Sequence, residues 1–142
     1  MFSEKDLIFR VPERSVLDFV SGGFAQQILV VAAAEPGFPG NRDFLAKILA
    51  AARLDLEKDT LFAEVPAGES ISVLPAIKHK HAGYILVFGL SAVQLGIVAE
   101  MTPYQPQIFY GATFLFADAL SVLEPDKTRK GNLWQALRQM FL

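Results

Sequence analysis

Short apolar runs, separated by prolines and glycines, constrain the fold of this chain most. Ile28–Ala34 and Tyr84–Phe88 are continuous apolar segments, and Thr60–Val65 is a third run of strand-forming residues. Continuous runs of this length are typical of strands buried on both faces, as in the centre of a parallel sheet. All three are far shorter than the roughly 20 residues that a helix needs to cross a bilayer. They therefore predict a buried sheet, and we expect no membrane partner.

Segments with helical spacing alternate with these strands. The turn residues Glu35–Gly40 precede Asn41, which we expect to cap a helix over Asn41–Arg53 because apolar residues recur there at intervals of three and four. Pro125 and Asp126 are expected to open a final helix, whose apolar stripe consists of Leu133, Trp134, Leu137, Met140 and Phe141.

Four further segments are shorter or ambiguous. A short helix is predicted over 15–24, and another after Ser91 with Gly96 near its end. The segment 71–77 fits a strand or a helix, because Pro75 interrupts it. Residues 108–110 and 113–116 are expected to be strand pieces joined at Gly111. Strands alternating with helices predict a single α/β domain over 1–142, with three α/β/α layers and a mostly parallel sheet of about four strands.

Composition excludes several classes of function. The chain has 142 residues and no cysteine, so disulfides, thiolate nucleophiles and cysteine-ligated clusters are excluded. Its formal charge of -2 argues against a globally basic nucleic-acid binder. The first ten residues carry Glu4, Asp6 and Arg10 and no apolar core of a signal peptide, so we expect a cytoplasmic protein. The mean hydropathy of +0.34 fits either a well-filled core or an apolar patch covered by a partner.

Candidate site residues gather where the strands are predicted to end. In α/β sheets, ligands bind in the crevice beyond the carboxyl ends of the strands, where we expect the segments 35–40, 89–92 and 117–123 to meet. The first group is Glu35, Pro36, Gly37 and Phe38, where a carboxylate could polarise water; a simple Pro-Gly turn explains it as well. The group lacks the spacing of a phosphate-binding loop or a dinucleotide fingerprint.

The second group is Gly89 and Ser91, after the third strand. Such a turn can bring backbone N–H groups to a phosphate or a base, or simply connect a strand to a helix. Ser91 lacks the elbow motif of a nucleophile. The pair His79 and His81 has no evident third metal ligand, so we expect a solvated loop, no metal site and no cofactor.

A basic group opens the last predicted helix. Lys127, Arg129 and Lys130 are candidate phosphate contacts, because cations are unfavourable at a helix N-terminus without another reason. A solvated helix face is the simpler interpretation.

Taken in order, these segments resemble the uracil-DNA glycosylase superfamily, and in particular its bacterial iron–sulfur branch. The resemblance rests on Glu35-Pro36-Gly37 after one strand, Gly89-Leu90-Ser91-Ala92 after another, and a closing segment with Pro125, Lys127 and Trp134. It spans about Gln27 to Met140. It implies a glycosylase-like fold and a site at the same crevice.

The departures from the family pattern remove its chemistry. Ala33-Ala34 stands in place of the family's Gly-Glu, with Glu35 displaced by one position, and Ala117-Asp118 stands where the family has His-Pro. Glu64 lies in the region of the base-reading asparagine, and a carboxylate offers no N–H donor. A glycosylase must flip a base, read its edge and stabilise a charged transition state. The resemblance therefore implies a scaffold without catalytic residues.

A second resemblance is to the psi subunits of the bacterial DNA polymerase III clamp-loader assembly, which share the glycosylase-like fold without its chemistry. It rests on the apolar strand and short helix, a segment resembling Leu54 to Pro75, and the closing run from Pro125 to Trp134. This likeness implies a replication accessory that binds another protein. It is an analogy of fold and carries no site residue.

Three hypotheses for function follow. The first is a non-catalytic protein-interaction module that binds nucleic acid weakly or not at all. The second is a divergent nucleic-acid-binding protein or glycosylase that uses Glu35 and Asp118. The third is a small-molecule-binding domain. An enzyme needs Glu35 or Asp118 facing a base-sized pocket beside Gly89, whereas an interaction module should have a filled or shallow crevice there.

Overall fold

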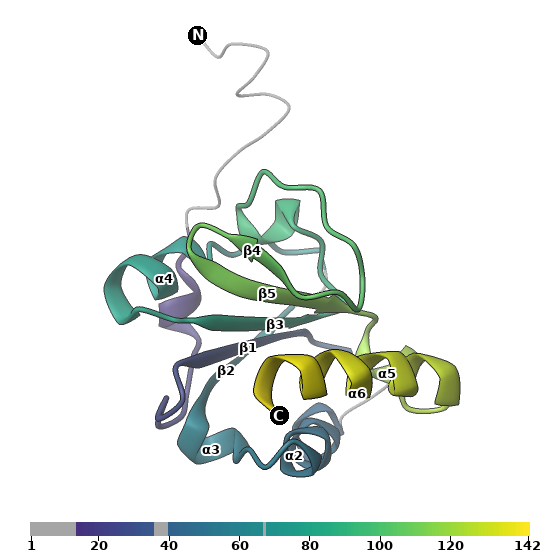
Figure 1. Ribbon diagram of the computed structural model, residues 1–142. Coiled ribbons are helices and arrows are strands. Elements are labelled where there is room, and N and C mark those ends of the chain that lie inside the picture. The colour runs from purple at the N-terminus through teal and green to yellow at the C-terminus, as the bar shows by residue number, and fades with distance from the viewer. Residues whose placement is uncertain (1–13, 36–39, 67) are drawn as a thin grey trace, which may run out of the picture.

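The computed structural model describes residues 14–35, 40–66 and 68–142. A twisted sheet runs through the middle of the domain and helices lie on both of its faces (Figure 1). The strands are β1 (Ile28–Ala33), β2 (Thr60–Val65), β3 (Tyr84–Phe88), β4 (Gln107–Phe109) and β5 (Ala112–Ala117). The helices are α2 (Asn41–Ala51), α3 (Leu56–Asp59), α4 (Leu74–Lys80), α5 (Leu120–Leu123) and α6 (Lys127–Phe141), with 3₁₀ turns η1 (Val16–Asp18) and η2 (Val93–Leu95).

The sheet has the strand order β2-β1-β3-β5-β4. The first four strands in this order are mutually parallel, and β4 pairs antiparallel with β5. The α/β class is confirmed. The expected sheet of about four strands describes the parallel part, to which the β4–β5 hairpin adds a fifth strand at one edge. Gly111 lies in the turn of that hairpin with a φ of 80°, a conformation in which glycine carries no steric cost.

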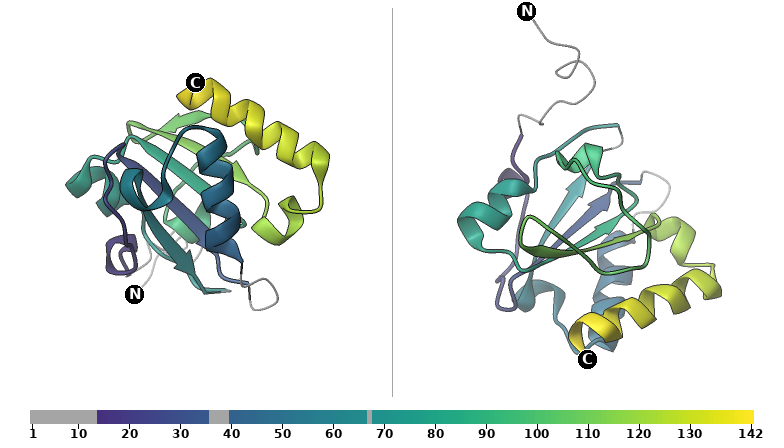
Figure 2. Two further views of the ribbon diagram at one scale, coloured as in Figure 1. Left: turned by 90° about the horizontal axis from the view of Figure 1, so that it is seen from below. Right: turned by 45° about the horizontal axis from the view of Figure 1, so that its top comes forward.

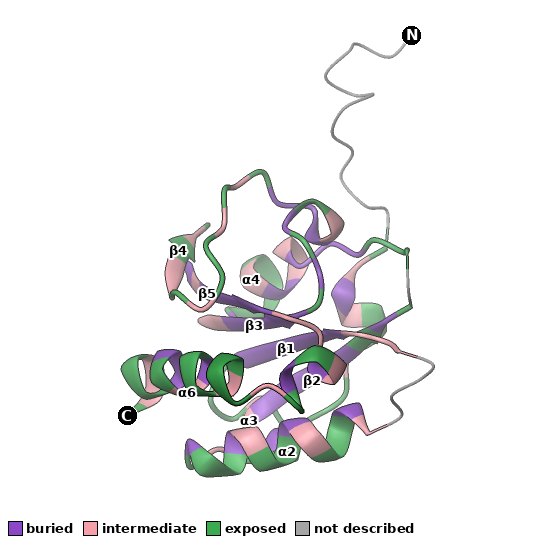
Figure 3. Ribbon diagram, turned by 90° about the vertical axis from the view of Figure 1, so that its right-hand side faces the viewer, coloured by how far each residue is buried: buried purple, intermediate pink, exposed green. Residues whose placement is uncertain are grey.

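The parallel strands are buried on both faces because each face contributes to a separate apolar core. Along β1, Leu29 and Val31 point into the core shared with η1 and α4, whereas Ile28 and Val30 point into the core shared with α2 and α6. Alternate side chains of a strand lie on opposite faces, so a strand between two helical layers must be apolar throughout. This arrangement produces the continuous apolar runs of the sequence. Figure 3 shows the buried strands between helices whose outer faces are exposed.

The free edge of β2 is covered by the segment before β1. Ser21 exchanges backbone hydrogen bonds with Phe62, at 3.1 and 2.9 Å. A β-carbon on Gly22 would lie 2.0 Å from the carbonyl oxygen of Thr60, so only glycine fits this approach. The predicted helix over 15–24 is therefore wrong beyond the single 3₁₀ turn at 16–18, because these residues pair with the sheet edge instead.

Two further helix expectations are settled by the structure. The predicted helix after Gly40 is confirmed as α2, but Gly40 is its N-cap and Asn41 is its first residue. The ambiguous segment around Pro75 begins helix α4, where proline is tolerated in the first turn.

His79 and His81 lie exposed at the end of this helix. Within the described ranges no group of three side chains could hold a metal ion, and no helix is long and apolar enough to span a bilayer.

Candidate functional site

The candidate residues that the structure describes lie at or near the carboxyl edge of the parallel strands. Ala33, Glu64, Phe88 and Ala117 stand at or next to the ends of four neighbouring strands. Pro36, Gly37 and Phe38 lie outside the described residues, so Glu35 is the one member of its predicted group whose position is known. Figure 2 shows this edge from two sides, with α5 and the start of α6 beside it.

The turn after β3 is tightly packed. Gly89 has a φ of 78°, and its N–H donates a hydrogen bond of 3.0 Å to the carbonyl of Ala117. A β-carbon on Gly89 would lie 2.9 Å from that of Ala119 and 3.3 Å from that of Ala33. The backbone N–H that could have met a ligand is therefore bonded within the sheet, and alanine side chains stand close on two sides of the glycine.

Ser91 acts as a local turn residue. Its hydroxyl accepts a hydrogen bond from the backbone N–H of Gln94 at 3.3 Å, and the side chain of Gln94 accepts one from the N–H of Ser91 at 3.0 Å. These two hydrogen bonds close the turn that leads into η2. This arrangement fits the simple connection that the sequence also allowed, and Ser91 has no base beside it in these bonds.

Glu35 is bonded across the edge to α5. Its carboxylate accepts hydrogen bonds from the hydroxyl of Ser121 and from the backbone N–H of the same residue, the second at 3.3 Å. A carboxylate that accepts from both groups of one residue satisfies the N-terminal turn of α5, where acidic side chains are favourable. The bonds tie the end of β1 to the segment after β5.

Glu64 is bonded to Asn41. The amide nitrogen of Asn41 donates to the carbonyl of Ala33 at 3.0 Å and to the carboxylate of Glu64 at 3.1 Å. Asn41 is buried, and its amide oxygen has no hydrogen-bond partner among the residues that the structure describes. The sequence predicted Asn41 as a helix cap, whereas its side chain instead joins the ends of β1 and β2.

Asp118 is the centre of the most connected polar group. Its carboxylate accepts a hydrogen bond from the hydroxyl of Tyr104 and lies 2.7 Å from the guanidinium of Arg129. Arg129 also pairs with Asp126 at 3.1 Å, and Asp126 caps α6 by accepting from the N–H of Arg129. The carboxylates of Asp118 and Asp126 therefore account for the presence of Arg129 in the first turn of α6, and no phosphate contact is needed to explain it.

This environment shifts the pKa values of Asp118, Tyr104 and Arg129, the last of which is raised by its hydrogen bond to Asp118. The hydrogen bond from Tyr104, together with the nearby guanidinium of Arg129, lowers the pKa of Asp118 below its ordinary value against the opposing effect of burial. Burial and the hydrogen bond to Asp118 raise the pKa of Tyr104 to about 12. Near neutral pH, Asp118 is therefore ionised and Tyr104 keeps its proton.

Sequence reasoning missed Tyr104, Ser121 and the linking role of Asn41. Tyr104 lies in a proline-rich loop, where periodicity gives no signal, and its backbone N–H donates to the carbonyl of Phe116 at 2.8 Å. The sequence predicts that the segments 35–40 and 117–123 meet, but the individual bonds of Ser121 and Asp118 follow from the fold.

The other basic candidates diverge from one another. Lys127 is exposed at the start of α6, whereas Lys130, one turn later, lines a groove between α6 and α2.

Comparison with known proteins adds no family: no protein-family model matches the chain, and no curated protein sequence matches it.

Proposed function

We propose that this chain is a non-catalytic protein-interaction module on a uracil-DNA glycosylase-like scaffold, with the role of a psi-like replication accessory. The observation that carries the proposal is that each described candidate carboxylate at the carboxyl edge is bonded to neighbouring groups of the fold. Glu35 is bonded to Ser121, Glu64 to Asn41, and Asp118 to Tyr104 and Arg129. In the glycosylase resemblance, this is the edge where a base would be read and cleaved.

The pKa of Asp118 and the hydrogen bonds of Glu35 support a non-catalytic role. A general base or acid works best when its pKa lies near the working pH. The pKa of Asp118 is lowered instead, by a hydrogen bond and a cation that hold it ionised. Glu35 is engaged by a serine and a backbone N–H rather than by a group that would activate it. Ala117, at the position of the family's histidine, offers no proton at all.

The packing at Gly89 supports the same proposal. Reading a flipped base requires donors aimed into a pocket that fits it. The N–H of Gly89 donates to the carbonyl of Ala117, and an added β-carbon on Gly89 would lie 2.9 Å from that of Ala119 and 3.3 Å from that of Ala33. The competing hypothesis, a glycosylase that uses Glu35 and Asp118, requires this edge to open and both carboxylates to leave their partners.

An activity assay separates the two hypotheses. Purified chain is incubated with single- and double-stranded DNA that contains uracil, and abasic sites are revealed by alkaline cleavage. We expect no strand breaks above the background of the buffer. Breaks at uracil that Glu35→Gln or Asp118→Asn abolishes would overturn the proposal.

A binding assay addresses the partner class. Fluorescence anisotropy with labelled oligonucleotides at about 0.15 M salt, where screening is physiological, is expected to show no binding. Micromolar binding that is lost when Lys127, Arg129 and Lys130 are changed to alanine would favour the nucleic-acid hypothesis. Affinity purification with the intact chain, followed by reconstitution with the purified candidate protein, is expected to give a complex of defined stoichiometry.

A further inference from the structure

A groove between α2 and α6 is the feature of the molecule that the carboxyl edge does not explain. Its volume is about 210 Å³, and Ile48, Ala51, Lys130, Leu133, Trp134 and Leu137 line it. Both helices lie on the same face of the sheet, away from α4 (Figures 1 and 3). Sites for drug-sized molecules usually measure about 300–1,000 Å³. The groove is therefore better sized for one or two large side chains of a partner than for a small-molecule ligand.

The floor of the groove is apolar. Five of the lining residues, Ile48, Ala51, Leu133, Trp134 and Leu137, carry no charge, and Trp134 and Ile48 remain partly exposed although both pack against the core. A half-buried tryptophan in a groove offers a large contact area that a partner can cover. A phosphate backbone would gain nothing from such a floor.

The rim of the groove is basic. Lys130 lines it, and Lys47 lies exposed one turn before Ala51 on the same face of α2. The ion pairs of the described residues involve neither lysine. Helix α6 contains no acidic residue and four basic ones, and in the described part of the chain Arg129 is the one of these four that pairs with carboxylates. Lys130 in the groove and Lys47 beside it therefore place positive charge next to an apolar floor, in a chain whose formal charge is -2.

From these observations we infer that the groove binds an amphipathic helix of a partner protein that presents apolar anchors flanked by acidic residues. The apolar anchors fill the groove beside Trp134, and the carboxylates face Lys130 and Lys47. Helices commonly dock in this way, with anchors at intervals of three and four residues. This inference rests on the proposed function and specifies the chemistry of the partner.

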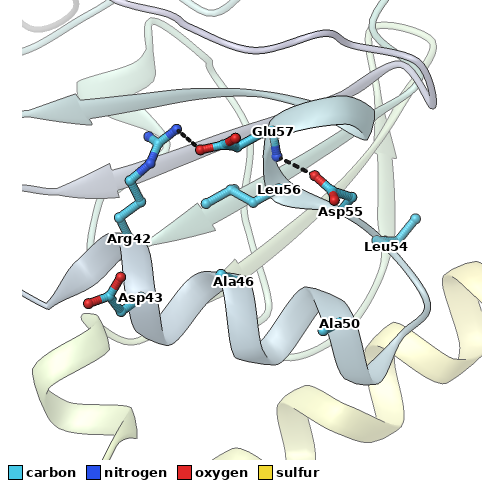
Figure 4. Close-up of a pocket in the computed structure, with 8 residues that line it drawn as sticks. All are labelled: Arg42, Asp43, Ala46, Ala50, Leu54, Asp55, Leu56 and Glu57. Carbon is cyan, nitrogen blue, oxygen red and sulfur yellow. Dashed lines mark hydrogen bonds and ion pairs between the residues drawn. The ribbon is translucent and has the colours of Figure 1, made fainter.

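Adjacent alanines of α2 provide a matched pair of variants. Ala51 lines the groove, whereas Ala50 lines a different hollow of about 310 Å³ on another side of the same helix. Figure 4 shows that second hollow, in which Arg42 pairs with Glu57 and Asp55 caps α3. Both alanines are exposed. Ala51→Glu places a carboxylate in the groove, and Ala50→Glu makes the same change of charge and helix propensity outside it.

The test uses a displayed library of helical peptides in which the apolar and charged positions vary, selected against the intact protein. Selected peptides without tryptophan are then titrated while the emission of Trp134, the single tryptophan of the chain, is recorded. We expect enriched peptides to carry net negative charge and to shift this emission. Ala51→Glu should weaken binding at least tenfold and Lys130→Glu at least threefold. Ala50→Glu, and Lys78→Glu on α4, should leave binding unchanged.

Three results would overturn the inference. They are the enrichment of no peptide or of basic peptides, equal binding by the Ala51→Glu and Ala50→Glu variants, or displacement of bound peptide by an oligonucleotide. Circular dichroism of each variant confirms that the comparison is made between folded proteins. The uracil assay does not depend on the groove, so a failure here leaves the proposed function standing, and a failure there is recognised separately.

Discussion

Gly89 and Ala119 approach each other so closely that a β-carbon on the glycine would lie 2.9 Å from the β-carbon of the alanine. Gly89 also adopts a φ of 78°, which costs an L-residue about 1–2 kcal/mol. Two independent causes therefore require glycine at the end of β3. The contact joins β3 to the segment after β5.

Gly89→Ala is expected to lower the free energy of unfolding by about 3 kcal/mol, because backbone strain and overpacking add. Urea denaturation followed by circular dichroism measures this loss. Gly111→Ala is the matched control, because Gly111 has a φ of 80° but no neighbouring atom within 4 Å of the added carbon. Its loss should be about 1 kcal/mol. Equal losses at the two positions would show that the contact with Ala119 is unimportant.

The hydroxyl of Tyr104 is expected to stabilise the fold through Asp118. Tyr104→Phe removes the hydrogen bond to the carboxylate and should lower the free energy of unfolding by about 1 kcal/mol, near the usual net value of such a bond in a partly exposed site. Tyr110→Phe is the control, since Tyr110 is 51% exposed and no hydrogen bond of its hydroxyl is found among the described residues. A loss from Tyr104→Phe no larger than that from Tyr110→Phe would contradict this role.

The same pair predicts how stability depends on pH. Because the pKa of Asp118 is lowered in the folded protein, its contribution is complete above the ordinary aspartate pKa of about 4 and is lost as the pH falls below it. Because the pKa of Tyr104 is raised to about 12, its contribution is complete below about pH 10 and is lost above it.

Tyrosinate absorbance measures the alkaline part of this prediction. The chain has three tyrosines, and Tyr104→Phe should remove the ionisation with a pKa of about 12. Asp118→Asn should bring the pKa of Tyr104 closer to the ordinary tyrosine value, because the carboxylate contributes to the raised pKa. For the acid part, the difference in unfolding free energy between the natural chain and Asp118→Asn should shrink below about pH 4. A constant difference would exclude the assigned role of Asp118.

The elements that the sequence predicted are those whose signal is local. The runs at 28–33, 60–65 and 84–88 are apolar throughout because helices cover both faces of the sheet, and this burial is visible in the sequence itself. The final helix was predicted from Asp126 and an apolar stripe, and both features are used as expected. The alternation of strands and helices then limits the architecture to an α/β fold.

The contacts of the site depend on long-range pairing, which a single sequence does not display. Glu35 meets Ser121, and Asp118 meets Tyr104, across loops whose course follows from the packing of the whole domain. The helix predicted near residue 20 failed for the same reason. Its local pattern favoured a helix, but pairing of Ser21 with the edge of β2 provides backbone hydrogen bonds that a short helix would not.

Asn41 provides the last prediction. Its amide nitrogen donates to both Ala33 and Glu64, so the residue joins two strand ends through its N–H groups. Asn41→Asp replaces these donors with a carboxylate that faces a carbonyl and another carboxylate in a buried position. The free energy of unfolding should fall by about 2–4 kcal/mol at neutral pH. Near pH 4 the loss should shrink, because a protonated carboxyl group can donate one hydrogen bond.

Asn41→Ala is the control, because it removes the donors without adding charge. Its loss of unfolding free energy should be smaller and should vary little with pH. Urea denaturation of both variants at the two pH values makes the comparison, and a pH-independent loss for Asn41→Asp would show that Glu64 and Ala33 do not constrain this position.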